Sequence, residues 1–218
     1  MIVSRRAAAD GLGTALLLAV VVGSGIMGER LADGNNAIAL LANSLATGFG
    51  LFALIIAFGP RSGAHFNPVV TALLAVRGDF PRKDVVAYVI SQFVGAIAGV
   101  LLAHAMFDLP LLQISLKERS SIGQWISEAV ATFGLVFVVL SCTKERISIA
   151  AAALGAYIAA AYWFTASTSF ANPAVTLARS LTATFAGIDP AHVVPFIVAQ
   201  SVGAALGLLL DRVLRASA

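Results

Sequence analysis

Charged residues are scarce in this chain of 218 residues. They make up 11% of the sequence, whereas hydrophobic residues make up 59%, and the mean hydropathy is +0.92. A soluble domain of ordinary composition carries about a quarter charged residues. The shortage of charge therefore argues against a soluble globular domain and predicts an integral membrane protein.

Other absences narrow the function. The single cysteine, Cys142, excludes an intramolecular disulfide and is interpreted as packing. The sequence shows no cluster of metal-ligating residues, no nucleophile–base pair and no glycine-rich phosphate loop, so we expect neither catalysis nor a metal or other cofactor. The formal net charge of +3 is spread over loops rather than gathered in a patch, so a nucleic-acid partner is not expected.

Long apolar runs dominate what is present. A helical membrane span needs about 20 mostly apolar residues. Six predicted spans cover residues 8–28, 37–59, 84–107, 124–142, 147–166 and 191–211, whereas the apolar pieces 67–76 and 172–183 are too short to cross. We therefore expect an all-α membrane protein with one transmembrane domain over residues 1–218.

The basic residues predict the orientation. With the N-terminus inside, the cytoplasmic side holds Arg5, Arg6, Arg61, Arg77, Arg82, Lys83, Lys144, Arg146, Arg212 and Arg215, and the outer side holds Arg30, Lys117, Arg119 and Arg179. This excess follows the positive-inside rule. It predicts that both termini are cytoplasmic.

The chain contains an internal repeat. VVAYVISQFVGAIAG from Val85 matches VVPFIVAQSVGAALG from Val193, and NPVVT from Asn67 matches NPAVT from Asn172. The first and fourth spans each carry an acid followed four residues later by threonine, after Asp10 and after Glu128. Each half, approximately residues 7–107 and 124–212, has three spans and one short piece. Because three crossings reverse the direction of the chain, the halves form an inverted repeat, which places the site near the bilayer midplane.

The two Asn-Pro pairs predict helix starts. Asn is a favoured N-cap and Pro a favoured first helical residue, so Asn67-Pro68 and Asn172-Pro173 each begin a helix too short to cross alone. By the inversion, the two N-termini meet and each contributes roughly +0.5 elementary charge. With the asparagine amides as donors, such a pore suits small neutral oxygen-bearing molecules and repels cations.

SGAHFNPVVT, the second NPAVT and the repeat resemble the aquaporin/glycerol-facilitator, or major intrinsic protein, family over essentially the whole chain. This resemblance implies six tilted helices plus two half-helices, one pore per subunit and four subunits per assembly. It also implies that Asp10 and Glu128 accept hydrogen bonds from the loops that lead into the half-helices. Asp10 is one methylene shorter than the usual glutamate, which puts its reach in question.

The resemblance further implies a selectivity filter of four side chains. Counting from the asparagines assigns them to Thr47, Ala160, Ser169 and Val175. Water-selective members carry bulky residues and an arginine at these places, whereas none of these four is large or charged. Arg179 lies one turn beyond Val175, and we expect it to point from the surface of the half-helix rather than to replace that arginine.

The sequence thus predicts a passive, homotetrameric channel for small uncharged solutes in a bacterial inner membrane. The wide filter resembles that of members that pass metalloid hydroxides such as arsenite, glycerol or urea, and metalloids are slightly favoured because the arginine is absent. The alternative is a secondary active transporter, which also uses inverted repeats and would need Asp10 or Glu128 as a coupling group. The hypothesis of a structural membrane or junction protein stays open as well, but it does not explain the two Asn-Pro pairs.

Overall fold

The computed structural model describes residues 2–216, with side chains described for residues 4–214, so the side chain of Arg215 lies outside the described residues. Regular structure in residues 2–216 is entirely helical, which confirms the predicted fold class. Six long helices match the six predicted spans: α1 (Ile2–Leu31), α2 (Asn36–Ser62), α4 (Val85–Met106), α5 (Ile122–Ser141), α6 (Ile147–Phe164) and α8 (Val193–Ala216). Each is long and apolar enough to cross a membrane.

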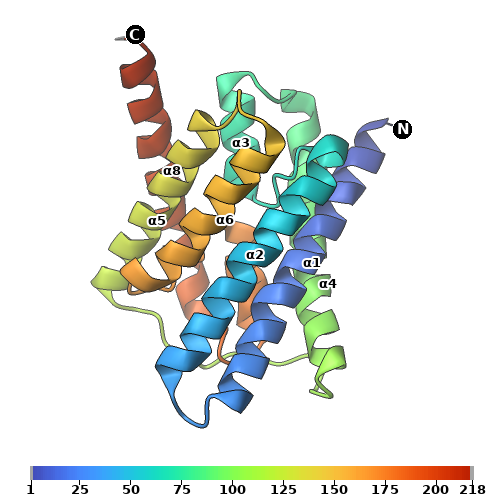
Figure 1. Cartoon of the computed structure of the whole chain (residues 1–218), viewed down its shortest axis with the longest axis vertical. Helices are drawn as coiled ribbons and strands as arrows, with labels where there is room; N and C mark the ends of the chain where they lie inside the picture. Colours follow the sequence, from blue (N-terminus) through green and yellow to red (C-terminus); the bar gives the residue numbers. More distant parts are fainter. Residues whose placement is uncertain (1, 217–218) are drawn as a thin grey trace.

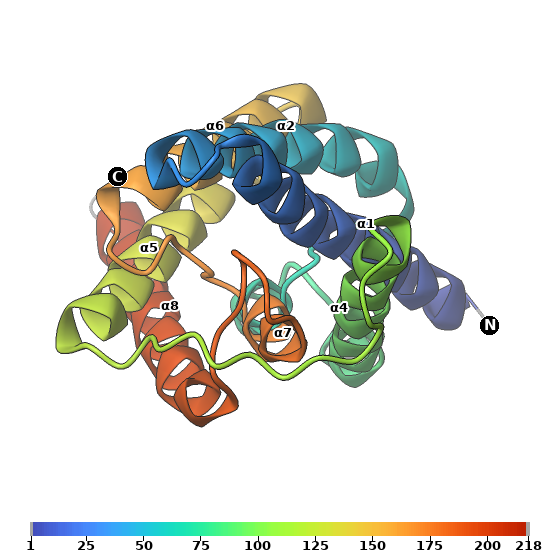
Figure 2. The same cartoon turned by 90° about the horizontal axis from the view of Figure 1, so that it is seen from below.

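The two short pieces form short helices. They are α3 (Pro68–Arg77) and α7 (Pro173–Ala178), and α7 continues into the 3₁₀ helix η2 (Arg179–Leu181). Two further 3₁₀ turns, η1 (Arg82–Asp84) and η3 (Pro190–His192), lead into α4 and α8. Both α3 and α7 lie between the long helices, as the end-on view in Figure 2 shows.

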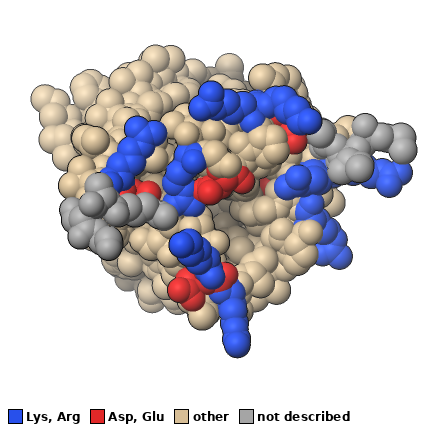
Figure 3. Space-filling model, turned by 90° about the horizontal axis from the view of Figure 1, so that it is seen from above, with Lys and Arg blue, Asp and Glu red and all other residues tan. Residues whose placement is uncertain are grey.

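Both termini lie at the same end of the molecule, here called the termini face (Figure 1). Lysine and arginine side chains surround this face in the space-filling view of Figure 3. At the other end, here called the opposite face, the long loop between α4 and α5 crosses the molecule (Figure 2).

The two halves are packed by the same contacts. Helix α1 packs along α4 in the first half, and α5 packs along α8 in the second. A Cβ atom added to Gly95 would lie 2.0 Å from the carbonyl oxygen of Gly11, and one added to Gly203 would lie 2.1 Å from that of Ala129. Glycine is therefore required at these two crossings, since it lets the helix backbones touch.

The second half-helix is anchored in the main apolar core. Ala174 and Ala178 of α7 are fully buried and belong to one cluster with Leu18 of α1 and Val100 of α4. Because one side of α7 is fixed in this way, its other side has a defined direction. That direction positions the site described next.

Candidate functional site

Each half-helix begins at an asparagine, as expected. The side chain of Asn67 accepts a hydrogen bond from the backbone N–H of Val69, and Pro68 is the first residue of α3. Asn172 accepts from the N–H groups of Ala174 and Val175 at the start of α7. These bonds satisfy donors that a helix start leaves unpaired. They also fix the orientation of both amide groups.

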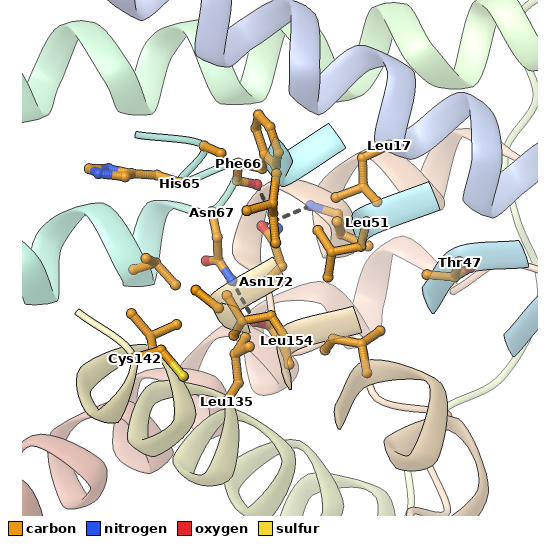
Figure 4. A pocket seen from close by; sticks show the side chains of 18 of the residues that line it. Leu17, Thr47, Leu51, His65, Phe66, Asn67, Leu135, Cys142, Leu154 and Asn172 are labelled. Carbon is orange, nitrogen blue, oxygen red and sulfur yellow. Dashed lines mark hydrogen bonds between the residues drawn. The ribbon is translucent and has the colours of Figure 1, made fainter. Parts of the chain in front are cut away.

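The two asparagines are brought together. The Nδ2 atom of Asn67 donates to the carbonyl oxygen of Ala171, and the Nδ2 atom of Asn172 donates to that of Phe66, both at 2.8 Å (Figure 4). Each amide therefore binds the residue that precedes the other asparagine. This exchange holds the N-termini of α3 and α7 against each other in the middle of the molecule.

The buried acids hold the loops before the half-helices. Glu128 is fully buried and accepts bonds from the backbone N–H groups of Phe170 and Ala171 at 2.8 and 2.9 Å, and from Gln200 at 2.6 Å. Asp10 accepts four bonds of 2.7–3.0 Å, whose donors are the side chains of Ser62 and Gln92 and the backbone N–H groups of His65 and Phe66. Asp10 thus reaches its loop although it is one methylene shorter than Glu128.

These loops have an unusual backbone. Ala64 and Phe66 in the first loop, and Ser169 and Ala171 in the second, have positive φ values of 52°, 51°, 49° and 46°. Such conformations of non-glycine residues cost of the order of 1–3 kcal/mol each and persist only where the surroundings hold them. Here the carboxylates bind the N–H groups, while the asparagine amides bind two of the carbonyl groups. Both loops are thereby fixed in this strained conformation beside the asparagines.

A single cavity of about 310 Å³ includes both asparagines. Toward the termini face it is lined by Gly59, Cys142, Glu145 and Ile147, and toward the opposite face by Thr47, Tyr162, Ser169, Val175 and Arg179. Leu17, Leu51, Leu135 and Leu154 form apolar walls between the two ends (Figure 4). The cavity thus combines the polar groups of the two asparagines with apolar leucine side chains.

Three of the four predicted filter residues line this cavity. Thr47, Ser169 and Val175 are all at least 94% buried and lie in its wall. Ala160 does not, because it is exposed on α6. Ile158 and Tyr162 take its place, and the Tyr162 hydroxyl lies 3.2 Å from that of Thr47. A shift of two residues turns a helix by about 200°, so the count that led to Ala160 reached the wrong face.

Arg179 corrects a second expectation. Its exposed fraction is 2%, and it lines the cavity instead of pointing away from the half-helix. The cavity wall near Val175 therefore includes a charged residue, Arg179, and large side chains such as Tyr162 and Phe170. The repeat carried a signal for this placement: at the offset of 105 that aligns the asparagines, Arg179 corresponds to Leu74, which lines the cavity in the first half.

Two further cations lie close to Arg179 at the opposite face. Arg119 is buried and donates to the carbonyl oxygens of Gly187 and Ser167. The ammonium group of Lys117 donates to the Phe185 carbonyl oxygen. Burial of the Lys117 ammonium, together with the charges of Arg119 and Arg179, lowers its pKa to about 8. The sequence had assigned all three cations to the same side, but not to one cluster.

Comparison with known proteins finds a matching family and similar chains. A family model described as major intrinsic protein matches residues 1–156. The chain is 53% identical over 209 residues to the aquaglyceroporin AqpS of Rhizobium meliloti (strain 1021), an alignment that covers 96% of this chain and 89% of that one. It is 30% identical over 223 residues to Aquaporin Z of Bradyrhizobium diazoefficiens, with 95% and 92% covered.

The fold is also similar to a solved structure. The X-ray structure of the aquaglyceroporin from Plasmodium falciparum superposes with a TM-score of 0.77 over 98% of this chain and 97% of that one. The sequences are 19% identical. This likeness concerns the fold.

Proposed function

We propose that the main solutes of this protein are larger than water. The chain belongs to the major intrinsic protein family and is a passive channel for water and small neutral solutes such as glycerol. The proposed class comprises glycerol, urea and neutral metalloid hydroxides such as arsenite. All of them carry several oxygen or nitrogen atoms on a small uncharged body.

The observation that carries this proposal is Val175 in the cavity wall. It stands three residues after Asn172, where the resemblance to water-selective members leads us to expect an arginine. An apolar side chain at this position carries no fork of donors. It provides an apolar surface in the same cavity that Thr47, Tyr162 and Ser169 line, a combination that suits the carbon and hydroxyl groups of a polyol.

The asparagine pair supports selection against cations. Two helix N-termini with partial positive charge meet at Asn67 and Asn172, so the field at this point opposes a positive solute. The amides donate to solute oxygens, and the loop carbonyls accept from solute hydroxyls. A neutral solute that both donates and accepts replaces its lost water contacts here.

The buried acids support passive rather than coupled transport. Both oxygens of Asp10 and of Glu128 accept hydrogen bonds from loop N–H groups or from glutamine. These bonds hold both carboxylates on the loops that lead into the half-helices. We therefore assign Asp10 and Glu128 to the scaffold rather than to a proton relay.

We further propose a homotetramer in the inner membrane of a bacterium, with one pore per chain, both termini cytoplasmic and the two halves forming an inverted repeat. The bacterial relatives and the basic rim of the termini face support this placement (Figure 3). Many exposed apolar side chains on the outside of the helix ring provide the surface for lipid and neighbouring subunits.

Stopped-flow light scattering of proteoliposomes tests the proposal. Vesicles that contain the protein are expected to take up glycerol, urea and arsenite faster than empty vesicles, along the gradient and without saturation. An Asn67→Leu/Asn172→Leu double variant reconstituted at matched density serves as the control. Uptake of water alone, or saturable uptake that follows an ion gradient, would contradict the proposal.

A further inference from the structure

Arg179 lines the cavity, but the proposed function does not use it. Arg179 lies four residues after Val175, and residues four apart share a face of a helix. The chain keeps its helical direction between them, because η2 continues directly from α7. Both residues line the same cavity.

The repeat supports this placement independently. The residues at the equivalent positions of the first half, Val70 and Leu74, also line the cavity. Both half-helices therefore present two successive turns to the lumen. Three of these four side chains are apolar, and the fourth, Arg179 in η2, is charged.

Arg179 is buried and forms no ion pair with any described residue. Among the described residues, the ion pairs involve Arg77 with Asp79 and Asp211, and none involves Arg179. A guanidinium group has five N–H donors. In the described part of the chain one of them is used, by the Nε atom, which donates to the carbonyl oxygen of Ala186. The guanidinium carbon lies 3.4 Å from the centre of the Phe170 ring.

An unpaired buried cation is costly unless polar atoms solvate it. The cavity is where such atoms can reach Arg179, since its side chain forms part of the wall. The remaining N–H donors are therefore available to water or to a solute in the lumen. Arg119, by contrast, donates hydrogen bonds to the carbonyl oxygens of Gly187 and Ser167 and thereby stabilises the surrounding loops.

A second polar group in the same wall has no partner. The Oγ atom of Ser169 is buried and makes no hydrogen bond with any described residue. Its equivalent in the first loop is Ala64, which has the same left-handed backbone. The hydroxyl is therefore not needed to build this loop. Because Ser169 lines the cavity, the lumen is the side from which a partner for this buried hydroxyl can come.

We propose that Arg179 is a specificity-determining residue of this channel: it supplies the fixed positive charge of the constriction from one turn beyond Val175, and with Ser169 it binds solute oxygens. This inference rests on the proposed function. The constriction then has two levels, an apolar one at Val175 that sets the width and a cationic one at Arg179 that selects oxygen-rich neutral solutes and rejects cations.

The test compares two solutes of the same planar shape, urea and the guanidinium ion, which differ by one charge. Arg179→Leu introduces the residue that the first repeat carries at this place, whereas Arg179→Lys keeps the charge but removes the fork. Arg30→Gln removes an exposed cation at the same face and serves as the matched control. Size-exclusion elution in detergent verifies that every variant assembles like the wild type.

In proteoliposomes, Arg179→Leu is expected to raise the ratio of guanidinium to urea flux and to lower the ratio of glycerol to water flux, each by about tenfold. Arg179→Lys retains the exclusion of guanidinium but loses glycerol flux, and Arg30→Gln changes neither ratio. Ratios in Arg179→Leu within about twofold of the wild type would overturn the role of Arg179.

The same experiment separates the two proposals. Absence of glycerol and urea flux in the wild type contradicts the proposed function. The guanidinium flux of the wild type and of Arg179→Leu still tests whether Arg179 excludes cations. If Arg179→Leu does not assemble, Arg179→Lys decides: unchanged glycerol-to-water ratio in that variant refutes the binding of solute oxygens by the guanidinium fork.

Discussion

Asn67 and Asn172 each donate a hydrogen bond of 2.8 Å to the residue that precedes the other asparagine. Each amide therefore both caps its own half-helix and ties the two half-helices together. The donors and the positive helix ends meet at one point of the cavity. The position of this point follows from the two copies of a five-residue motif, at Asn67 and at Asn172. A buried acid accepts hydrogen bonds from the residues that precede each copy.

Replacement of Asn172 by Asp is expected to weaken exclusion of cations. A carboxylate offsets the positive helix ends and cannot donate to the Phe66 carbonyl oxygen. Glycerol flux, measured in proteoliposomes by stopped-flow light scattering, falls, and potassium leak, measured with a potassium-sensitive dye, rises. Asn36→Asp, at the exposed start of α2, provides a control with the same change of charge. Equal potassium leak in both variants would remove the asparagine pair from the mechanism.

Replacement of Glu128 by Gln is expected to destabilise the protein by about 1–3 kcal/mol, because the amide meets the donors of Phe170, Ala171 and Gln200 with one acceptor fewer. The thermal transition in detergent falls, and the remaining flux shows no dependence on a proton gradient. Glu29→Gln, an exposed acid, leaves the transition unchanged. Loss of proton-driven accumulation in Glu128→Gln would instead identify a coupled transporter.

Replacement of Gly203 by Ala is expected to separate α5 from α8, because the added Cβ atom lies 2.1 Å from the Ala129 carbonyl oxygen. Overpacking of this kind costs about 1–3 kcal/mol. Gly123→Ala, where the nearest atom is 3.9 Å away, is the matched control on α5. Thermal unfolding in detergent compares the two, and equal transition temperatures would disprove the close helix contact.

The cation cluster at the opposite face predicts a pH dependence at Lys117. Its pKa is lowered to about 8, below the usual value near 10.4, so the amine becomes neutral as the pH rises through this value. Because the unfolded chain still holds the proton there, stability rises with pH between these two values. Competitive labelling with an amine-reactive reagent, read by mass spectrometry, is expected to show a midpoint near 8. A midpoint near the usual value would contradict the burial of the Lys117 ammonium group beside Arg119 and Arg179.

The long helices were predictable because a membrane span needs only length and apolar character, and both are read directly from residues. The half-helices were predictable because Asn-Pro is a local signal that recurs at the repeat offset. The roles of Asp10 and Glu128 came from the resemblance. The geometry adds the four donors of Asp10, including the Ser62 hydroxyl, which no local pattern indicates.

The wall of the constriction was harder to predict. Counting back from Asn172 to α6 crosses an irregular loop, so the helical phase is lost and Ala160 is assigned in place of Ile158 or Tyr162. Arg179 was misplaced because an isolated half-helix has a surface, whereas here the following loop folds back and Ala186 receives its Nε donor. Such long-range packing is absent from the local sequence.

The central claim is that the apolar side chain of Val175 sets the width of the constriction. Val175→Arg tests it most directly, with Val175→Met as a control of similar length that adds no charge. Water flux and glycerol flux are measured by stopped-flow light scattering in the same vesicles at matched protein density. We expect Val175→Arg to lower glycerol flux by about tenfold or more relative to water flux, and Val175→Met to have a smaller effect. Equal losses of water and glycerol flux, or no loss of either, would contradict the claim.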